Sequence, residues 1–338
     1  MVLRKRALLD LVTRSILECR WNVLYLANPD NHPFKLQVYR DDESYRIRIY
    51  IWNLTHGGGS ARPRSEYRIQ ITGLSTNYFE PEIGGKTLIL GWWNEVGVFA
   101  GFDYNKHSGT LGSSPSIQIR EQVLRNAHIN GFSACDKGNG EIAIAFKPSF
   151  FIEYIKNLES LHGFGESEYD LSVLETVAEN PYAENDGEIE SASWTRQTVI
   201  QTVKKRLRDS SFQDRVLTAY NYRCAMCGVQ LDLVQAAHIV PVSYEDGTDE
   251  TSNGIALCAL HHYAYDRGLV FVDEDYSIEL NQSKLNRLRV ISRDEGLEKF
   301  TEALRAIILL PPATSDRPHR DYLSIANFLR LSASQHKI

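Results

Sequence analysis

The stretch NGIALCALHHYAYDRG, residues 253–268, contains two adjacent histidines, His261 and His262, which follow Cys258 by three and four residues. Successive side chains on a helix point about 100° apart, so two neighbouring histidines cannot both serve one small site. We therefore expect His261 and His262 to have different tasks, and the rest of the sequence indicates what these tasks are.

A metal site is predicted by the spacing of three cysteines and one of these histidines. Cys224 and Cys227 form a Cys-x2-Cys pair, and thirty residues later Cys258 and His261 form a Cys-x2-His pair. Two such pairs supply the four ligands of a tetrahedral structural zinc ion. The chain has five cysteines, and an odd number argues against a disulfide framework. His261 is thus assigned to Zn²⁺, which leaves His262 for a second site.

The segment between the two pairs adds His238, in AAHIVP (236–241), and Asn253, which precedes the apolar run into the predicted helix. An imidazole titrates near neutral pH, so His238 on a short strand can take a proton from water. One turn into the helix, His262 can hold a divalent cation. Asp266 follows four residues later on the same helix face, which makes it a candidate second ligand or a group that orients His262.

In the order CAMCG, AAHIVP and SNGIALCALHHYAYDRGL, these motifs resemble the HNH endonucleases, in the subgroup with paired zinc-binding Cys/His residues. The resemblance covers about residues 212–280, and LLPP and RPHRDYL (309–323) are similar to the C-terminal extension of restriction-type relatives. It implies two antiparallel strands and a helix around a catalytic Mg²⁺ (or Mn²⁺), hydrolysis of DNA phosphodiester bonds, His238 as general base, and an Asn253 that fixes the strand bearing His238.

Ala237 departs from the family pattern, because many HNH enzymes carry an aspartate or histidine metal ligand immediately before the base. Asp266, water or a DNA oxygen has to complete the metal shell. One alternative is therefore a catalytically inactive zinc-containing DNA-binding protein. Another is a defence nuclease that a nucleotide messenger activates.

Charge along the chain is uneven, although the net charge of the 338 residues is −6. Residues 164–190 contain nine acidic side chains and no Lys or Arg, whereas 194–223 contain seven Lys or Arg. We predict an α+β protein: a recognition domain at 1–162 with a mixed sheet or partial barrel, an acidic linker at 163–193, and an HNH domain with a helical C-terminal extension at 194–338. Without an apolar run of eighteen residues, no membrane span is expected.

Secondary-structure signals are clearest in the first domain. Helices are expected over 1–20, 116–131 and 148–163, and strands at LQVYR, YRIRIYIW, YRIQITGL, KTLILGWW and EIAIAF. A further helix is expected from 194 onward, with a break near Ser210 and Ser211.

Double-stranded DNA is the expected partner of the first domain, with either an unmodified or a modified base as the feature that it reads. Aromatic and basic residues lie close together there, and GSSPS (112–116) precedes the helix expected at 116, whose free N–H groups could bind a phosphate. Trp92 and Trp93 should point to opposite faces of a strand. The candidate DNA-binding residues are Arg68, Trp93, Tyr104, Lys106, His107, Lys204, Lys205, Arg206 and Arg208.

Cutting both strands with a single-cut module usually requires two copies, so a homodimer is expected, with the tail from Asn281 onward as a candidate interface. The first residues, MVLRKRALLDLVTRSI, have charges scattered among apolar positions, unlike a signal peptide. A cytoplasmic location in a bacterial-type cell is the corresponding expectation.

Overall fold

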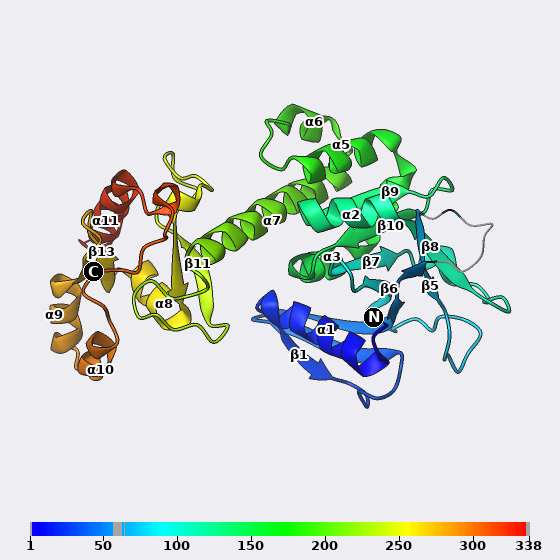
Figure 1. Cartoon of the computed structure of the whole chain (residues 1–338), viewed down its shortest axis with the longest axis horizontal. Coiled ribbons are helices and arrows are strands. Elements are labelled where there is room, and N and C mark those ends of the chain that lie inside the picture. The colour runs from blue at the N-terminus through cyan, green and yellow to red at the C-terminus, as the bar shows by residue number, and fades with distance from the viewer. Residues whose placement is uncertain (1, 57–62, 64, 336–338) are drawn as a thin grey trace. The chain divides into compact units, whose positions relative to one another are not determined.

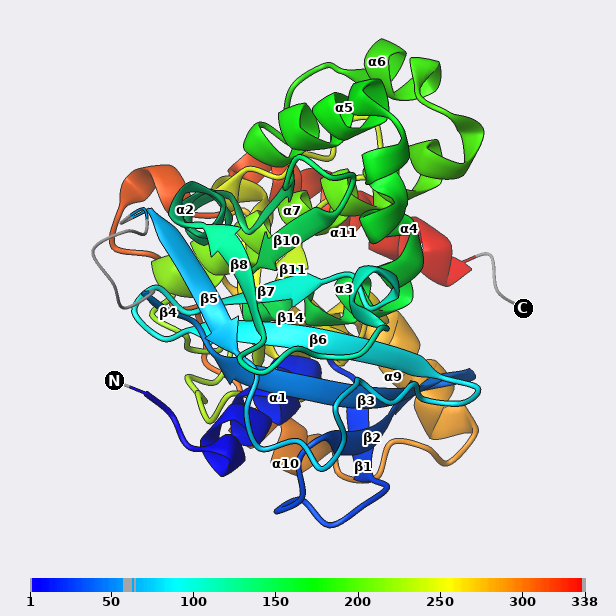
Figure 2. The ribbon, with the colours of Figure 1, turned by 90° about the vertical axis from the view of Figure 1, so that its right-hand side faces the viewer.

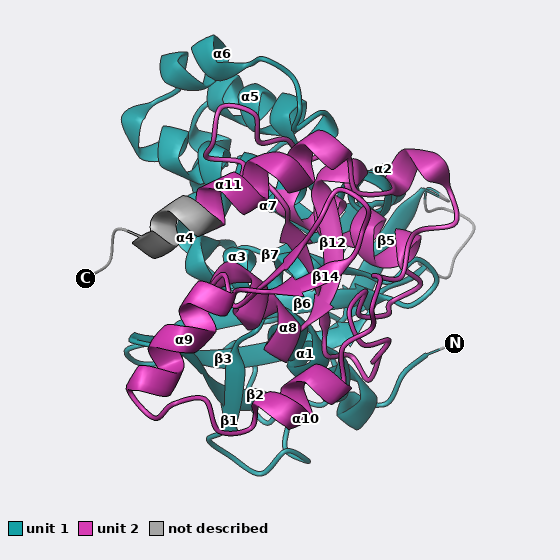
Figure 3. Ribbon diagram, turned by 90° about the vertical axis from the view of Figure 1, so that its left-hand side faces the viewer, with its two compact units in different colours: residues 1–208 teal, residues 209–338 magenta. Residues whose placement is uncertain are grey.

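The structure is a computed structural model and describes residues 2–56, 63 and 65–335. The chain divides into two compact units, Met1–Arg208 and Asp209–Ile338, which Figure 3 shows in different colours. The residues described form two hydrophobic cores in unit 1 and one in unit 2. The fold is mixed α+β, as the sequence predicts.

Unit 1 is built on a mixed sheet, in which seven strands are described. Their order is β1-β2-β3-β6-β7-β10-β9, and β3 and β6 pair in parallel whereas the other neighbours are antiparallel. The strands are β1 (Asn22–Tyr25), β2 (Phe34–Arg40), β3 (Glu43–Asn53), β6 (Lys86–Trp93), β7 (Val98–Phe102), β9 (Phe132–Asp136) and β10 (Ile142–Phe146).

Both faces of this sheet are buried, which explains why its central strands are apolar at nearly every position. Along β3, Ile47, Ile49 and Ile51 point into one core, whereas Tyr50 and Trp52 point into the other. The second core lies under a small sheet of β4 (Thr55–His56), β5 (Glu66–Gln70) and β8 (Ser116–Arg120), together with α2 (Glu121–Asn130). Figure 2 shows β5 and β8 in front of the larger sheet.

Helices cover the first face of the sheet. Helix α1 (Lys5–Glu18) packs beside β1 and β3 (Figure 1), and its apolar residues Leu8, Leu9, Val12 and Ile16 are fully buried. The other helices of unit 1 are α3 (Phe151–Lys156), α4 (Leu158–His162), α5 (Glu168–Glu179), α6 (Asp186–Ser191) and the first part of α7 (Trp194–Ala219).

Short 3-10 turns occur in both units. They are Asn105–His107, Pro148–Phe150 and Gly163–Glu166 in unit 1, and Thr251–Asn253 and Thr314–Asp316 in unit 2.

The acidic segment 163–193, expected to be a linker, is folded in unit 1. Ser167 caps α5 by accepting a hydrogen bond from the Asp170 N–H at 3.2 Å. The Asp170 carboxylate is buried and accepts hydrogen bonds from the backbone N–H and the hydroxyl of Ser193. Leu174 and Val177 on the same helix join the first core. The other acidic residues of α5, Glu168, Glu175 and Glu179, are exposed or partly exposed, as in an ordinary amphipathic helix. The compact units divide the chain at Arg208 rather than within the expected linker.

Two other expectations for helices are wrong. Residues 116–120 form strand β8, because Ile117 and Ile119 alternate with polar residues and pair with β5, and the helix starts only at Glu121. The GSSPS stretch therefore leads into a strand and offers no helix N-terminus for a phosphate. Helix α7 also runs without a break through Ser210 and Ser211. The predicted end of α2 is right: Gly131 adopts a left-handed φ of 95° and ends the helix.

Unit 2 contains the hairpin of β11 (Val234–His238) and β12 (Gly254–Cys258), followed directly by α8 (Ala259–Asp266). A second hairpin, β13 (Val270–Val272) and β14 (Ile278–Leu280), precedes α9 (Gln282–Val290), α10 (Leu297–Glu302) and α11 (Arg320–Gln335). The hydrophobic core of unit 2 is formed by residues of the end of α7, the first hairpin, α8 and α11. Among the described residues, no helix has the length and apolar character needed to cross a membrane.

Candidate active site and metal centre

The hairpin β11–β12 separates the candidate zinc ligand Cys258 from the candidate base His238, which lie at opposite ends of the paired strands. Val234 pairs with Cys258 at one end, and His238 pairs with Gly254 at the other. Helix α8 starts at Ala259, immediately after Cys258, and carries His261 and His262. The two strands and the helix therefore have the ββα arrangement that the sequence predicts.

The four predicted zinc ligands lie together. Their ligand atoms are all within 4.8 Å of one another. Nδ1 of His261 is 3.5 Å from Sγ of Cys224 and 3.3 Å from Sγ of Cys258, and the Sγ atoms of Cys227 and Cys258 are 4.0 Å apart. A tetrahedral zinc ion with bonds of about 2.0–2.3 Å separates its ligand atoms by roughly 3.3–3.8 Å. The cluster therefore has the donor set and nearly the spacing of a structural zinc site.

The backbone of the Cys224–Cys227 knuckle forms hydrogen bonds within the knuckle, to β12 and to the tail. The N–H of Gly228 donates to the Cys224 carbonyl at 2.7 Å, with Gly228 in the left-handed region at φ 80°. The N–H of Ala225 donates to Ala256 in β12. Leu309, from the tail, donates to the Ala225 carbonyl at 2.8 Å. The knuckle thus joins the hairpin to the C-terminal segment, and a bound ion would link both to α8.

The thiols of the cluster have different proton affinities. Burial acts to raise the pKa of Cys224, but hydrogen bonds from His261 and from backbone N–H groups lower this pKa to about 6. Burial raises the pKa of Cys227 to about 12 and also raises that of Cys258. The protein alone thus stabilises one thiolate. A divalent cation would supply the positive charge needed for the other two, as expected for a metal site.

His238, at the end of β11, is held from two sides. Its Nε2 atom lies 3.0 Å from Oδ1 of Asp249, whose side chain is only 5% exposed. The ring of Phe212 stacks on the imidazole at a centroid distance of 3.7 Å and an angle of 5°. Because the carboxylate accepts the Nε2 proton, the lone pair of a neutral ring lies on Nδ1. The arrangement orients an imidazole for proton transfer.

Asp249 and Phe212 are two functional candidates that the sequence analysis missed. Asp249 lies in the loop SYEDGTDETSNG, in which several acidic residues are indistinguishable by spacing. The guanidinium of Arg215 donates to the Asp249 backbone carbonyl and to the Ser211 hydroxyl, which ties the loop to α7.

Asn253 is fully buried and locks the loop between the two strands. Its side-chain oxygen accepts from the Val240 N–H at 2.9 Å, and its amide donates to the carbonyls of Val240 and Thr248 at 2.9 and 2.8 Å. The backbone carbonyl of Asn253 accepts from the N–H of Ile239, the residue after His238. The asparagine thus fixes the chain immediately beyond the candidate base.

Gly254 explains why glycine follows Asn253. A Cβ at this position would lie 2.3 Å from a methyl of Val216 and 3.0 Å from the ring of Phe212. Helix α7 therefore packs directly on the backbone of β12, and this close approach lets Phe212 reach the imidazole of His238.

His262 is oriented by β11. Its Nδ1 atom is 3.0 Å from Oε1 of Gln235, and its Nε2 atom is 3.4 Å from Oδ2 of Asp266, one turn further along α8. In the part of the chain that the structure describes, the zinc cluster is the only close group of three or more His, Cys, Asp or Glu side chains. His262 and Asp266 can therefore offer a cation two ligands, while the methyl of Ala237 offers none.

The candidate DNA-binding residues of unit 1 are largely buried or paired. Trp93 is buried against Tyr67, and Trp92 points into the opposite core. Tyr104 is partly buried and donates to the Phe79 carbonyl. His107 lies 2.8 Å from Glu141, whereas the neighbouring Lys106 is exposed.

Arg68 is exceptional among these residues. Its side chain is only 9% exposed, and its nearest carboxylate oxygen, on Glu66, is 3.8 Å away. The Nε and Nη2 atoms of Arg68 are buried and have no hydrogen-bond partner among the described residues. Buried guanidinium donors without a partner are costly, and the described residues supply none for these two atoms.

Three of the four basic candidates on α7 have partners inside unit 1. Lys204 binds Asn185 and Asp186, Arg206 donates to the Ser149 carbonyl, and Arg208 lies over the ring of Tyr182. Lys205 is the exposed member of the group. The basic charge of this segment thus partly serves to hold α7 against its neighbours.

Comparisons with known proteins match each unit to a different family. The family described as Methylase-associated X1 matches residues 45–155, and the family described as HNH endonuclease matches residues 224–273. No curated protein matches the chain.

One solved structure that is similar to the chain is a "Modification dependent TagI restriction endonuclease". It has 12% sequence identity and a TM-score of 0.30, over 82% of this chain and 80% of that one. The HNH match spans the zinc cluster, His238, Asn253, α8 and β13, and it agrees with the ββα geometry. Residues 224–273 therefore form an HNH endonuclease domain, and residues 45–155, within the mixed-sheet unit, match the Methylase-associated X1 family.

Proposed function

We propose that the protein is a restriction-type, metal-dependent endodeoxyribonuclease, in which unit 2 cleaves double-stranded DNA and unit 1 recognises it. The observation that carries this proposal is the site around His238. There, an imidazole is oriented by a buried carboxylate at the end of a ββα hairpin, within a segment that matches the HNH endonucleases.

In this proposal, His238 removes a proton from the attacking water, and Asp249 stabilises the imidazolium that forms. Asn253 keeps the end of β11 in position through its three hydrogen bonds. His262 and Asp266 would bind Mg²⁺ or Mn²⁺, with water and DNA oxygens as the remaining ligands. The cation would neutralise charge on the phosphate and on the leaving 3′-oxygen, giving 5′-phosphate and 3′-hydroxyl ends.

The four-residue Cys/His cluster would hold Zn²⁺ in a structural role. A closed set of four protein ligands leaves no open position for substrate, which distinguishes it from a catalytic zinc site. The ion would join the knuckle to the end of β12 and to α8, and so would stabilise the scaffold that carries His262.

The family of unit 1 supports restriction-type recognition. Its name associates it with methylases, and a nuclease that acts beside a methylase has to distinguish modified from unmodified DNA. Arg68 is the best-supported reading residue, because its unsatisfied donors can make the two parallel hydrogen bonds that arginine gives to guanine. We also propose that two copies act on one duplex, each cutting one strand.

Cleavage assays test the proposal. Plasmids that differ only in cytosine or adenine modification are incubated with the full chain and Mg²⁺ or Mn²⁺, and the ends are sequenced. Wild type should cut at least one of these DNAs, and His238→Ala should not. His319→Ala, which removes an exposed histidine of the same unit, should cut normally. Absence of cutting on every DNA would instead favour an inactive zinc-containing DNA-binding protein, in line with Ala237.

A further inference from the structure

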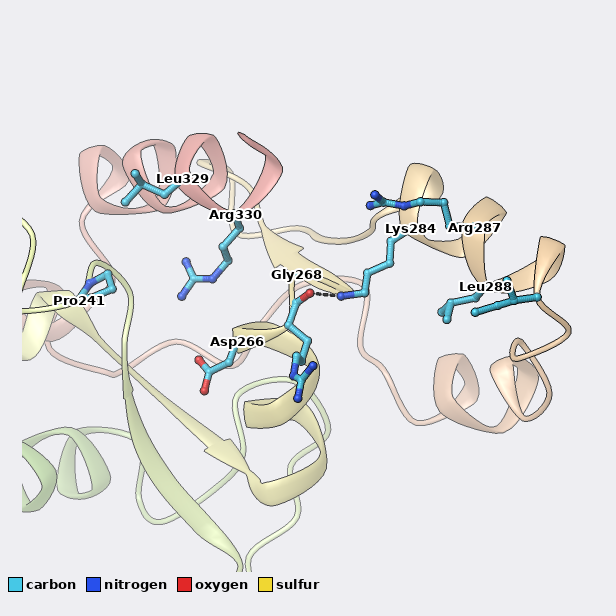
Figure 4. Close-up of a pocket in the computed structure, with 10 residues that line it drawn as sticks. Pro241, Asp266, Gly268, Lys284, Arg287, Leu288, Leu329 and Arg330 are labelled. Atoms are coloured by element: carbon cyan, nitrogen blue, oxygen red, sulfur yellow. Dashed lines mark hydrogen bonds between the residues drawn. The ribbon is translucent and has the colours of Figure 1, made fainter. Parts of the chain in front are cut away.

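A second feature of unit 2 is a pocket of about 630 Å³ formed by α8, α9, α11 and the loop after β11. Its volume lies within the range of small-ligand sites, about 300–1,000 Å³. Figure 4 shows that Asp266 and Arg330 point into the same space from α8 and α11. Lys284, Arg287 and Arg330 of the lining belong to the tail from Asn281 onward, the candidate dimer interface.

The lining is strongly basic. It contains four cationic side chains, Arg267, Lys284, Arg287 and Arg330, and one carboxylate, Asp266. Burial lowers the pKa of Lys284, and the nearby charges of Arg267 and Arg287 lower it further. A concentration of like charge in a concave site costs folding free energy and attracts anions. The chain as a whole has a net charge of −6, so its average composition does not account for four cationic side chains around one pocket.

Two of these cations are held in place by neighbouring groups. The Lys284 ammonium donates to the Arg267 carbonyl, the bond drawn as a dashed line in Figure 4. The Arg330 guanidinium lies over the ring of Tyr265 at 3.9 Å and donates to the Ile239 carbonyl at 3.0 Å. Their positive charge is therefore positioned before a ligand arrives, which lowers the entropy cost of binding.

The pocket adjoins the candidate catalytic residues. Asp266 lines it and also lies 3.4 Å from Nε2 of His262. The Ile239 carbonyl that binds Arg330 belongs to the residue after His238. Leu288 and Leu329 provide apolar lining, which suits the faces of deoxyribose rings. Phosphates bound here would belong to nucleotides close to the bond that is cleaved.

We infer that this pocket binds the sugar-phosphate backbone of the cleaved DNA strand beside the scissile phosphate, with Arg287 as one phosphate contact. The inference rests on the proposed nuclease function and adds α9 and α11 to the DNA-binding surface. It assigns the C-terminal extension to substrate binding.

A matched pair of variants on α9 tests this assignment. Arg287 lines the pocket, whereas Arg289, on the same helix, binds Asn286 and Asp294 outside it. Affinity of the full chain for a DNA duplex is measured with Ca²⁺ in place of Mg²⁺, over a range of KCl concentrations. Arg287→Ala should weaken binding about 5–10-fold and reduce the slope of log K against log salt by about 0.9, the value for one phosphate contact.

Arg289→Ala removes the same charge and should change affinity less than about 2-fold, with the slope unchanged. Equal effects of the two variants, or none from Arg287→Ala, would overturn the assignment. Binding is measured without turnover, so this test of the pocket does not depend on cleavage. If wild type binds DNA but cleaves none, only the proposed nuclease function is contradicted.

A free nucleotide is the other source of the same phosphate chemistry. In the cleavage assay, added dAMP should leave the wild-type rate unchanged or reduce it by competition. Cleavage that begins only when dAMP is added, and that Arg287→Ala abolishes, would make the pocket an effector site and would overturn its assignment to the DNA strand.

Discussion

The Nε2 atom of His238 lies 3.0 Å from the Oδ1 atom of Asp249, and these residues belong to a strand end and a loop eleven positions further along the chain. A partly buried imidazole against a buried carboxylate is the arrangement that enzymes use to fix a histidine tautomer and stabilise the imidazolium. Asp249 is thus expected to act through His238 rather than on DNA.

Replacing Asp249 by asparagine should lower kcat by about 10–100-fold while KM changes little, because the amide keeps a hydrogen bond but loses the charge that stabilises the imidazolium. Steady-state cleavage kinetics measure this split. Glu250→Gln is the matched control, since it removes an adjacent, exposed charge and should leave kcat within about 2-fold of wild type. A normal kcat in Asp249→Asn would show that His238 does not depend on this carboxylate.

Gly254→Ala should disturb the His238 site through Phe212, whose ring stacks on the imidazole. The added methyl would lie 2.3 Å from Val216 and 3.0 Å from Phe212, so the ring that stacks on His238 has to move. Overpacking of this kind costs about 1–3 kcal/mol of unfolding free energy. Urea denaturation measures the loss, and cleavage should fall in parallel.

Gly187→Ala is the corresponding control, because a Cβ at Gly187 meets no atom within 4 Å. Its unfolding free energy should stay equal to that of wild type or rise slightly. Wild-type stability in Gly254→Ala would show that α7 and β12 are not in close contact.

Removal of zinc should unfold unit 2 and spare unit 1. The four ligands join the knuckle to the end of β12 and to α8, so Cys227→Ser should reduce the zinc content of the protein to near zero and lower the melting temperature of unit 2. Metal analysis and calorimetry measure both quantities. Cys135→Ser changes a thiol in unit 1 outside the cluster and should leave one zinc per chain. A chain that folds normally without zinc would contradict the structural role.

Glu141 should give unit 1 a defined acid sensitivity. Burial acts to raise the pKa of Glu141, but hydrogen bonds from His107 and Lys137 lower this pKa to about 2, below its ordinary 4.5. A depressed pKa in the folded state stabilises the protein above the unfolded value, and the stabilisation is lost as pH falls from 4.5 toward 2.

In Glu141→Gln this acid-dependent loss should be smaller, as urea denaturation at several pH values would show. Glu159→Gln, at an exposed partner of Lys86, should keep the wild-type pH dependence. If the unfolding free energy of Glu141→Gln depended on pH as steeply as that of wild type, the hydrogen bonds of Glu141 with His107 and Lys137 would contribute nothing to acid stability.

The sequence was informative where chemistry is encoded by local spacing. Cys224, Cys227, Cys258 and His261 lie together because a knuckle and the first turn of a helix bring ligands three residues apart onto one ion. Runs of β-branched and aromatic residues in the sequence predict strands of unit 1 that the structure contains, among them β3 and β6. Trp92 and Trp93 point into opposite cores because successive side chains of a strand alternate.

Other features depend on contacts that spacing does not encode. Asp249 is one of several acidic residues in its loop, and the hydrogen bonds of Asn253 to Thr248 and of Arg215 to Asp249 help to hold the loop beside His238. The acidic composition of residues 163–193 predicts a linker, yet α5 buries its apolar side against the sheet. Local spacing does not separate strand β8 from helix α2, because α2 starts at Glu121, directly after the last residue of β8.

The measurement that most directly tests the central claim is single-turnover cleavage of a bound DNA duplex by wild type and His238→Ala at saturating Mn²⁺. If His238 is the general base, the variant should bind DNA within about 2-fold of the wild-type affinity and cleave it at least about 100-fold more slowly. Cleavage by His238→Ala at the wild-type rate, with DNA binding intact, would contradict the account.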